Sequence, residues 1–166
     1  MSAVAALPRP SLELRATVSD LLAEYGQRID SDELESWVEL FTEDADYRVV
    51  LRENVEQGLP GIVIWCDSRN MIRDRVDSYR NVNEYNLHWD RHVIGLPRFV
   101  AHEAGTWTVE ASYMLAQTAQ ENGESRLFSV GLMRCKVRVE GDSARFAGVE
   151  IVADTGLVPT LLATPI

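Results

Sequence analysis

The stretch RLFSVGLMRCKVRV (126–139) decides the fold of this chain of 166 residues. From Phe128 onward its apolar side chains fall on even-numbered positions up to Leu132 and on odd-numbered positions from Met133. Successive side chains of a strand point to opposite faces, so a shift of one residue in the alternation is typical of a β-bulge. Gly131 stands beside the shift, and we therefore expect a long strand that bends at this glycine.

The segments on either side of this stretch favour the same interpretation. The preceding segment, TWTVEASYMLAQTA (106–119), alternates between apolar and polar residues, and QENGE (120–124) follows it as a hairpin turn. The last apolar series of the chain changes parity between Phe146 and Val149, with Gly148 at the change. Neighbouring strands that change phase at glycines predict a sharply curved sheet, either antiparallel or mixed.

The first half of the chain is expected to supply helices and shorter strands. Apolar residues recur every three or four positions from Ser11 to Ile29, which indicates a helix. Asp30 and Glu33 form a capping-box pattern, which predicts that a second helix begins at Asp30. The elements expected next are a strand at 45–51, a loop at 52–61, a strand at 62–66 and a helix capped by Asp67 or Ser68.

These elements together predict an α+β fold in a single domain. The concave face of a curved sheet has to be covered, and the N-terminal helices are available to cover it. We expect a cone-shaped domain at residues 11–166, in which the curved sheet wraps around two or three helices. Residues 1–10, which include two prolines, are expected to form a flexible N-terminal arm.

Composition and charge exclude several classes of function. The formal net charge is −10, which argues against binding to nucleic acid or to an anionic membrane surface. No apolar run approaches the length of a membrane span, and the first ten residues do not resemble a secretory signal. The two isolated cysteines, Cys66 and Cys135, are expected to be reduced and buried. These features favour a cytoplasmic protein.

The stretch LHWDRHVIGLPR (87–98) suggests a metal site, because two histidines and a carboxylate are the ligands of a non-haem iron. His88, Asp90 and His92 would share one face of a strand, with the outer pair roughly 13 Å apart. Metal–nitrogen bonds are about 2 Å long, so one ion could not reach all three. In a helix Asp90 would point away from the histidines. A two-histidine site completed from elsewhere in the chain stays open.

Proton transfer inside the cone is a second enzymatic hypothesis. A carboxylate or histidine in a pocket between helices and sheet can have a shifted pKa and act as a lyase or isomerase base. The candidates are Tyr25, Asp46, Tyr47, His92 and Glu150. Motifs for a nucleotide-binding loop or a serine nucleophile are absent from the sequence. A plain binding module is the third alternative.

A structural interpretation of the 87–98 stretch competes with both. Pro97 removes a backbone donor and should end a strand, while Arg91, His92 and Arg98 stand around the apolar VIGLP. Arginine suits carboxylates and carbonyls at subunit contacts, although exposed strand-end arginines are also common. The charged residues of the helix expected after Ser68, which include Arg73 and Arg75, have the same two interpretations. They form subunit contacts, or they form an exposed helix face. The apolar tail, from Leu157 to Ile166, is expected to be buried by the domain or by a partner.

Five segments, in order, resemble the small (beta) subunit of bacterial Rieske-type aromatic-ring-hydroxylating dioxygenases. They are WVELFTEDADYRV (37–49), RENVEQGLP (52–60), DSRNMIRDRV (67–76), RHVIGLPR (91–98) and LLATPI (161–166). The resemblance extends from about Leu21 to Ile166. It implies the cone fold of nuclear transport factor two and scytalone dehydratase, also called cystatin-like.

The resemblance also implies a role without catalytic residues in this chain. In such enzymes the large (alpha) subunit carries the Rieske [2Fe–2S] cluster and the mononuclear iron, and three large and three small chains form a hexamer. The complex incorporates dioxygen into an aromatic ring with electrons from NAD(P)H. The similarity is greatest to systems that act on carboxylated aromatics such as terephthalate or salicylate. The framework and contact residues it implies are Arg73, Arg75, Arg91, His92, Pro97, Arg98 and Ile166.

Overall fold

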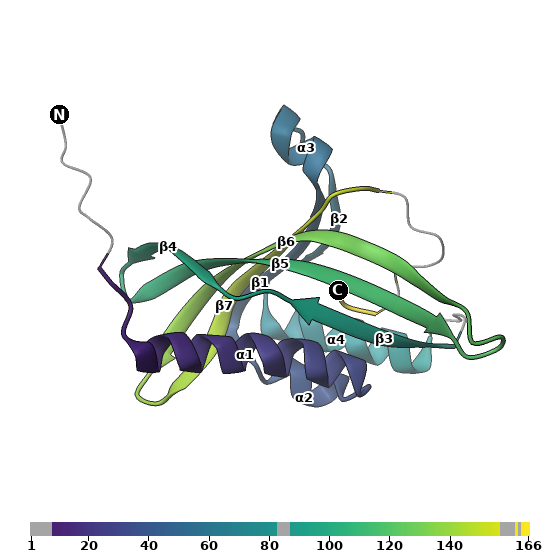
Figure 1. Ribbon diagram of the computed structural model, residues 1–166, viewed down its shortest axis with the longest axis horizontal. Coiled ribbons are helices and arrows are strands. Elements are labelled where there is room, and N and C mark those ends of the chain that lie inside the picture. Colours follow the sequence, from purple (N-terminus) through teal and green to yellow (C-terminus); the bar gives the residue numbers. More distant parts are fainter. Residues whose placement is uncertain (1–7, 83–86, 157–161, 163) are drawn as a thin grey trace.

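A curved sheet with helices along its concave side forms the domain (Figure 1). The structure is a computed structural model and describes residues 8–82, 87–156, 162 and 164–166. Most of the arm predicted at residues 1–10 lies outside these ranges. Within them, no helix is both long and apolar enough to span a lipid bilayer.

Four helices are assigned among the described residues. They are α1 (Leu12–Asp30), α2 (Leu34–Val38), α3 (Arg52–Gln57) and α4 (Arg69–Asn81). The side chain of Ser11 caps α1 by accepting from the Leu14 amide at 3.1 Å, and Ser68 caps α4 in the same way, as predicted. Two expectations were wrong: α1 continues through Asp30, so no capping box begins there, and residues 52–57 form a helix instead of a loop.

The strands form one mixed sheet. They are β1 (Phe41–Leu51), β2 (Ile62–Cys66), β3 (His88–Ile94), β4 (Arg98–Glu103), β5 (Thr106–Ala119), β6 (Ser125–Glu140) and β7 (Ser143–Ala153). The order is β2-β1-β7-β6-β5-β3, and β4 also pairs with β5. The β1–β7 pair is parallel and the others are antiparallel. The short strands β2 and β3 therefore lie at opposite edges.

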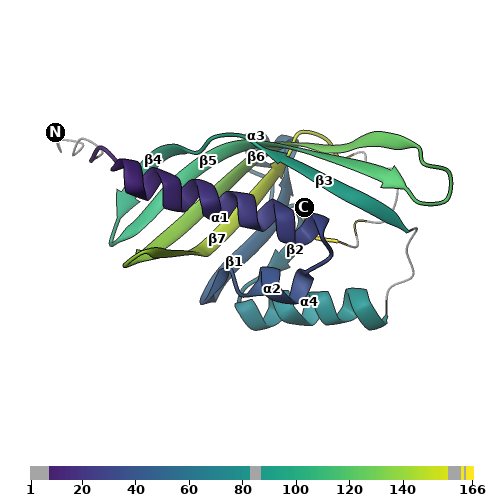
Figure 2. The ribbon, with the colours of Figure 1, turned by 60° about the horizontal axis from the view of Figure 1, so that its bottom comes forward.

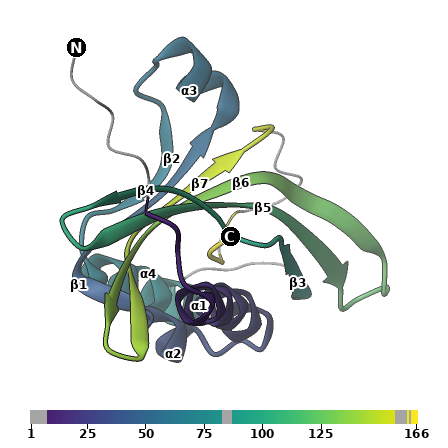
Figure 3. The ribbon, with the colours of Figure 1, turned by 60° about the vertical axis from the view of Figure 1, so that its left-hand side comes forward.

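The sheet bends around α1, as the strand pattern predicted. Figures 2 and 3 show α1 across the concave side of the sheet, with α2 and α4 beside β1. The buried stripe of α1 belongs to the same apolar core as the inward side chains of β5, which are Val109, Ala111, Tyr113 and Leu115. The predicted α+β cone is therefore confirmed.

The bulges lie close to the predicted positions but not at both glycines. Between β6 and β7 the extra residue is Ala147, next to Gly148. Between β5 and β6, Leu115 and Ala116 pair with Ser129 and Leu127, so the extra residue is Phe128 and not Gly131. The bulge allows the ring of Phe128 to remain buried while the alternation changes parity.

Gly131 is needed for a different reason, the close approach of β7. A Cβ atom at this position would lie 2.0 Å from the carbonyl oxygen of Val152. The backbone of a paired strand cannot move away without breaking its hydrogen bonds to the neighbouring strand. Gly131→Ala is therefore expected to lower the free energy of unfolding by about 1–3 kcal/mol. Gly95→Ala is the control, since its Cβ would make an ordinary contact at 3.5 Å. Equal urea midpoints for the two variants would contradict this expectation.

Candidate functional site

The two histidines and the aspartate of the 87–98 stretch lie on the inner face of β3, where each has a local partner. The backbone N–H of His92 donates to one oxygen of Asp30 at 2.9 Å. Its Nδ1 lies 2.7 Å from the other oxygen, which can only accept. Both side chains are at most 2% exposed. Asp30 therefore joins the last turn of α1 to the edge strand β3.

Asp90 is the centre of a second buried polar group. Its Oδ2 accepts from the hydroxyl of Thr164 at 3.3 Å and lies 3.5 Å from Nε2 of His88. Its Oδ1 is buried and has no hydrogen-bond partner among the described residues. Thr164 belongs to the end of the chain, so this group connects the tail to β3.

These contacts do not create a metal site at β3. His92 is directed to Asp30 and His88 to Asp90, so the three predicted donors do not converge on one point. Among the residues with described positions, no three His, Cys, Asp or Glu side chains are grouped closely enough to hold an ion. The residues that are present do not fit an iron ligand set. Asp30 was missed as a partner of His92, because its position before SDELES resembles a helix cap.

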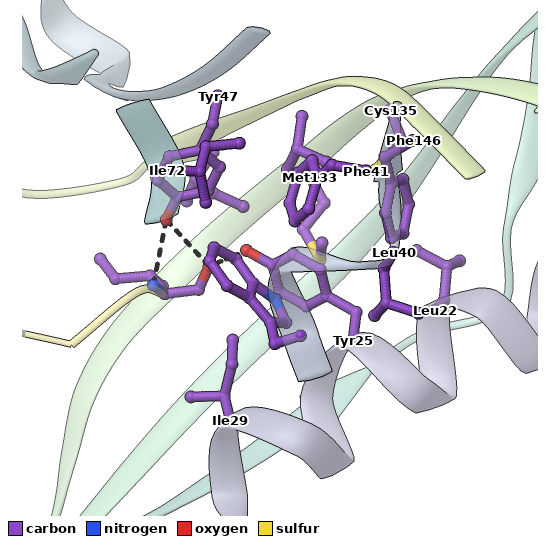
Figure 4. Close-up of a cluster of buried hydrophobic side chains, with 14 of the residues drawn as sticks. Leu22, Tyr25, Ile29, Leu40, Phe41, Tyr47, Ile72, Met133, Cys135 and Phe146 are labelled. Atoms are coloured by element: carbon purple, nitrogen blue, oxygen red, sulfur yellow. Dashed lines mark hydrogen bonds between the residues drawn. The ribbon is translucent and has the colours of Figure 1, made fainter. Parts of the chain in front are cut away.

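The interior of the cone is filled by the chain itself (Figure 4). The hydroxyls of Tyr25 and Tyr47 both donate to the carbonyl oxygen of Ile166, the latter at 3.4 Å. The amide of Ile166 donates back to the Tyr47 hydroxyl at 3.2 Å. The ring of Trp37 packs edge-on against both tyrosines, and the ring of Phe41 packs edge-on against Tyr47. Ile166, which is 3% exposed, therefore fills space inside the cone that the proton-transfer hypothesis would need for a pocket.

Burial controls the protonation of these two hydroxyls. It raises the pKa of Tyr47 to about 12 and the pKa of Tyr25 well above its ordinary value. Both groups are therefore neutral donors at physiological pH. Since each already binds Ile166, neither is positioned to move a proton to or from a substrate.

The five proton-transfer candidates are not brought together. Tyr25, Tyr47 and His92 lie inside the cone, whereas Asp46 and Glu150 lie on the outer face of the sheet. Asp46 accepts from the indole N–H of Trp65 at 2.9 Å and pairs with Arg48. Glu150 accepts from Arg134 at 2.7 Å. The alternative of a free-standing proton-transfer enzyme is therefore not favoured.

A row of alternating charges crosses the outer face of the sheet. Strand register places Arg98, Glu110, Arg134, Glu150 and Arg48 next to one another on five successive strands. Glu110 bonds both of its arginine neighbours, and the hydrogen bond from Arg98 is the main reason that its pKa is lowered. Directly opposed unlike charges stabilise neighbouring strands modestly. Arg98 therefore has a partner inside the chain, although its side chain is largely exposed.

The segment between Arg91 and Arg98 borders a surface groove. The groove has a volume of about 320 Å³ and lies between α1 and residues 92–97. Leu96 is 89% exposed and the side chain of Arg91 is 69% exposed. Pro97 follows the end of β3, in agreement with its predicted role. These residues are accessible for the subunit contact that the sequence suggests, while His92 contributes to the framework beneath them.

The two arginines of α4 have different surroundings. Arg73 pairs with Glu39 at 3.2 Å and is exposed on the surface. Arg75 donates to the carbonyl oxygen of Leu162 at 3.1 Å, and its Nε is buried without a partner among the described residues. Arg75 therefore holds the tail from the side of α4.

The buried part of the tail, Thr164–Ile166, lies within the domain, as expected. Most of the residues from Leu157 to Ala163 lie outside the described ranges.

The buried tyrosines predict a steep loss of stability in alkali. A tyrosine whose pKa is raised by folding stabilises the fold fully below the unfolded pKa of about 10, and this stability is lost as the pH rises toward 12. Each such tyrosine should lower the free energy of unfolding by about 1.4 kcal/mol per pH unit in this window. Phenolate absorbance and circular dichroism should therefore change together above about pH 10.

Tyr47→Phe is the control for this titration. It removes one raised pKa, so the free energy of unfolding should fall less steeply with pH. The result that would contradict the expectation is a gradual rise of phenolate absorbance around pH 10 for every tyrosine, while circular dichroism stays native.

Comparison with known proteins gives consistent matches along most of the chain. Residues 10–149 match the SnoaL-like domain. The anthranilate 1,2-dioxygenase small subunit of Burkholderia cepacia is 39% identical over 142 residues, which are 86% of this chain and 88% of that protein. Subunit beta 1 of the terminal oxygenase component of terephthalate 1,2-dioxygenase from Comamonas sp is 31% identical over 87% of this chain and 93% of its own length.

A solved structure agrees with these relatives. It is described as the beta subunit of an aromatic-ring-hydroxylating dioxygenase from Novosphingobium aromaticivorans. The TM-score is 0.83 at 38% identity, and the match covers 92% of this chain and 96% of that one.

Proposed function

Since the chain belongs to the SnoaL-like domain family and, within it, to the small subunits of aromatic-ring-hydroxylating dioxygenases, we propose that it assembles a terminal oxygenase without contributing catalytic residues. In this role it binds a large subunit that carries a Rieske [2Fe–2S] cluster and a mononuclear iron. Three copies of each chain form the complex, which works in the cytoplasm.

One observation carries this proposal beyond the family relationship. The interior of the cone is occupied by Ile166, which is buried and hydrogen-bonded to the hydroxyls of Tyr25 and Tyr47. The donors at β3 are also engaged within the chain. A domain whose interior is filled by its own tail is suited to support a partner and not to turn over a substrate.

The substrate class follows from the relatives. Anthranilate and terephthalate, named for two of them, are both aromatic carboxylates. We therefore infer that the complete oxygenase acts on a carboxylated aromatic compound with dioxygen and electrons from NAD(P)H. The pocket that selects the compound lies in the large subunit under this proposal.

Purification of the tagged chain from its host tests the proposal. We expect a larger, brown polypeptide to co-purify in equal amounts, with the absorbance of a Rieske cluster and with all of the iron. Dioxygenation of an aromatic carboxylate should require that partner and a reductase, and the chain alone should be inactive. A pure preparation of this chain that binds no iron protein, or that has lyase or isomerase activity alone, would disprove the assembly role.

A further inference from the structure

Two buried hydrogen-bond donors beside the tail have no acceptor. One is the indole Nε1 of Trp37, a residue of α2 that is 1% exposed, and the other is Nε of Arg75 on α4. Neither nitrogen has a hydrogen-bond partner among the residues with described positions. Most buried polar groups of folded proteins have a partner, so two unsatisfied donors on neighbouring helices indicate a bound species that accepts from them.

Both residues line one small cavity. It lies between α2, α4, β1 and Pro165 of the tail, and Figure 2 shows α2 and α4 next to β1. Its volume is about 10 Å³, which leaves room for one water molecule or one monatomic ion of similar size and for nothing larger. Its other walls are mainly apolar and include Leu34, Ile72 and Val76.

Arg75 carries a positive charge that no carboxylate of the described residues balances. It stands on the buried stripe of α4, at helical spacing from Ile72 and Val76. The other three arginines of α4 each pair with a carboxylate, whereas none of the ion pairs among the described residues includes Arg75. It donates instead to the neutral carbonyl oxygen of Leu162. Withdrawing a charge from water without a partner of opposite sign is costly, so the cavity favours an anion.

A water molecule suits this cavity less well than an anion. A buried water molecule can accept from the two nitrogens, but it also has two protons of its own to donate. The hydroxyl of Tyr47, which lines the cavity, already accepts from the amide of Ile166 and donates to its carbonyl oxygen. An anion needs donors only, and the two unsatisfied nitrogens supply them.

We propose that a monovalent monatomic anion, chloride under physiological conditions, binds between Trp37 and Arg75. It accepts from both nitrogens and neutralises the guanidinium group. Since Arg75 also holds Leu162, the ion fastens the tail to α2 and α4. The inference concerns the stability of the domain, so it stands or falls independently of the oxygenase role and of any iron protein that co-purifies.

The stability of the purified chain in chloride and in gluconate tests the site. Sodium salts of the two anions give the same ionic strength, but gluconate is too large for the cavity. Since the ion binds only the folded chain, the equilibrium constant of unfolding should fall by up to tenfold for each tenfold rise in free chloride. Urea unfolding followed by circular dichroism measures this constant. An equal response to the two salts would overturn the inference, because screening alone would then account for it.

Paired variants assign the chloride dependence to the two donors. Trp37→Phe keeps an aromatic ring and removes the N–H, so chloride should bind about tenfold more weakly or less. Trp65→Phe is its control, because the indole of Trp65 already donates to Asp46. Arg75→Met should abolish the chloride dependence, whereas Arg73→Met should keep it, since Arg73 is exposed. Full chloride dependence in Trp37→Phe and in Arg75→Met would overturn the inference.

Crystals of the unsubstituted chain grown in bromide give a test that does not depend on the folding of a variant. Bromide has the charge of chloride and scatters anomalously, so an anomalous peak should lie between Nε1 of Trp37 and Nε of Arg75. Density without an anomalous signal would identify a water molecule and would overturn the inference, as would an empty cavity. An anomalous peak without chloride dependence in solution would mean binding at crystal concentration only, which would also overturn it.

Discussion

Asp30→Ala is expected to lower the free energy of unfolding by about 3–5 kcal/mol, because it removes one member of a buried pair. The carboxylate accepts both the backbone N–H and the ring N–H of His92, and both side chains are almost completely buried. Without it, two donors lose their partner in a site that water does not reach, at a cost of about 1–3 kcal/mol each. Urea unfolding followed by tryptophan fluorescence measures the change.

Two further variants establish the cause. Asp20→Ala, an exposed aspartate on the same helix, should change the free energy of unfolding by less than about 0.5 kcal/mol. In a double-mutant cycle with His92→Ala, the loss caused by Asp30→Ala should become much smaller. An Asp30→Ala chain with the stability of the Asp20→Ala chain would show that this pair does not hold α1 to β3.

Deletion of Thr164–Ile166 is expected to lower the free energy of unfolding by about 4 kcal/mol or more. Burial of the Ile166 side chain contributes about 1.5–3 kcal/mol. The hydroxyls of Tyr25 and Tyr47 would each lose their partner in an apolar chamber, which adds about 1–3 kcal/mol per group. A loss of this size is a large part of the stability of a single domain, so the shortened chain should also yield little oxygenase complex.

Substitutions at the last position separate packing from hydrogen bonding. Ile166→Leu keeps the volume and the backbone bonds, and it should cost less than about 1.5 kcal/mol. Ile166→Ala keeps the bonds but leaves a cavity, so a loss of about 2–5 kcal/mol is expected. Differential scanning calorimetry of the three chains should place the shortened one lowest. A shortened chain that melts with the parent would mean that the tail does not complete the core.

The features predicted from the sequence are those that depend on neighbouring residues. The strand at 106–119 has the predicted bounds, and its alternation placed the correct side chains inside. Ser68 caps α4, and the change of parity at Phe146 and Val149 does mark a bulge. Periodicity and capping are local, since each depends on residues within a few positions. Local patterns were therefore sufficient for the curved sheet and the helices beneath it.

The contacts that define the interior join residues far apart in the chain, and only the tertiary structure decided them. An aspartate such as Asp30 can cap a helix or accept a hydrogen bond from a distant strand. Its partner is His92, 62 positions away, because the end of α1 lies beside β3. Ile166 reaches Tyr25 across 141 positions. A hydrogen-bonding group accepts many partners with similar energy, so the partner is the one that burial leaves within reach. The sequence by itself determined most of the elements and the curvature of the sheet, while the packing of distant elements determined what fills the cone.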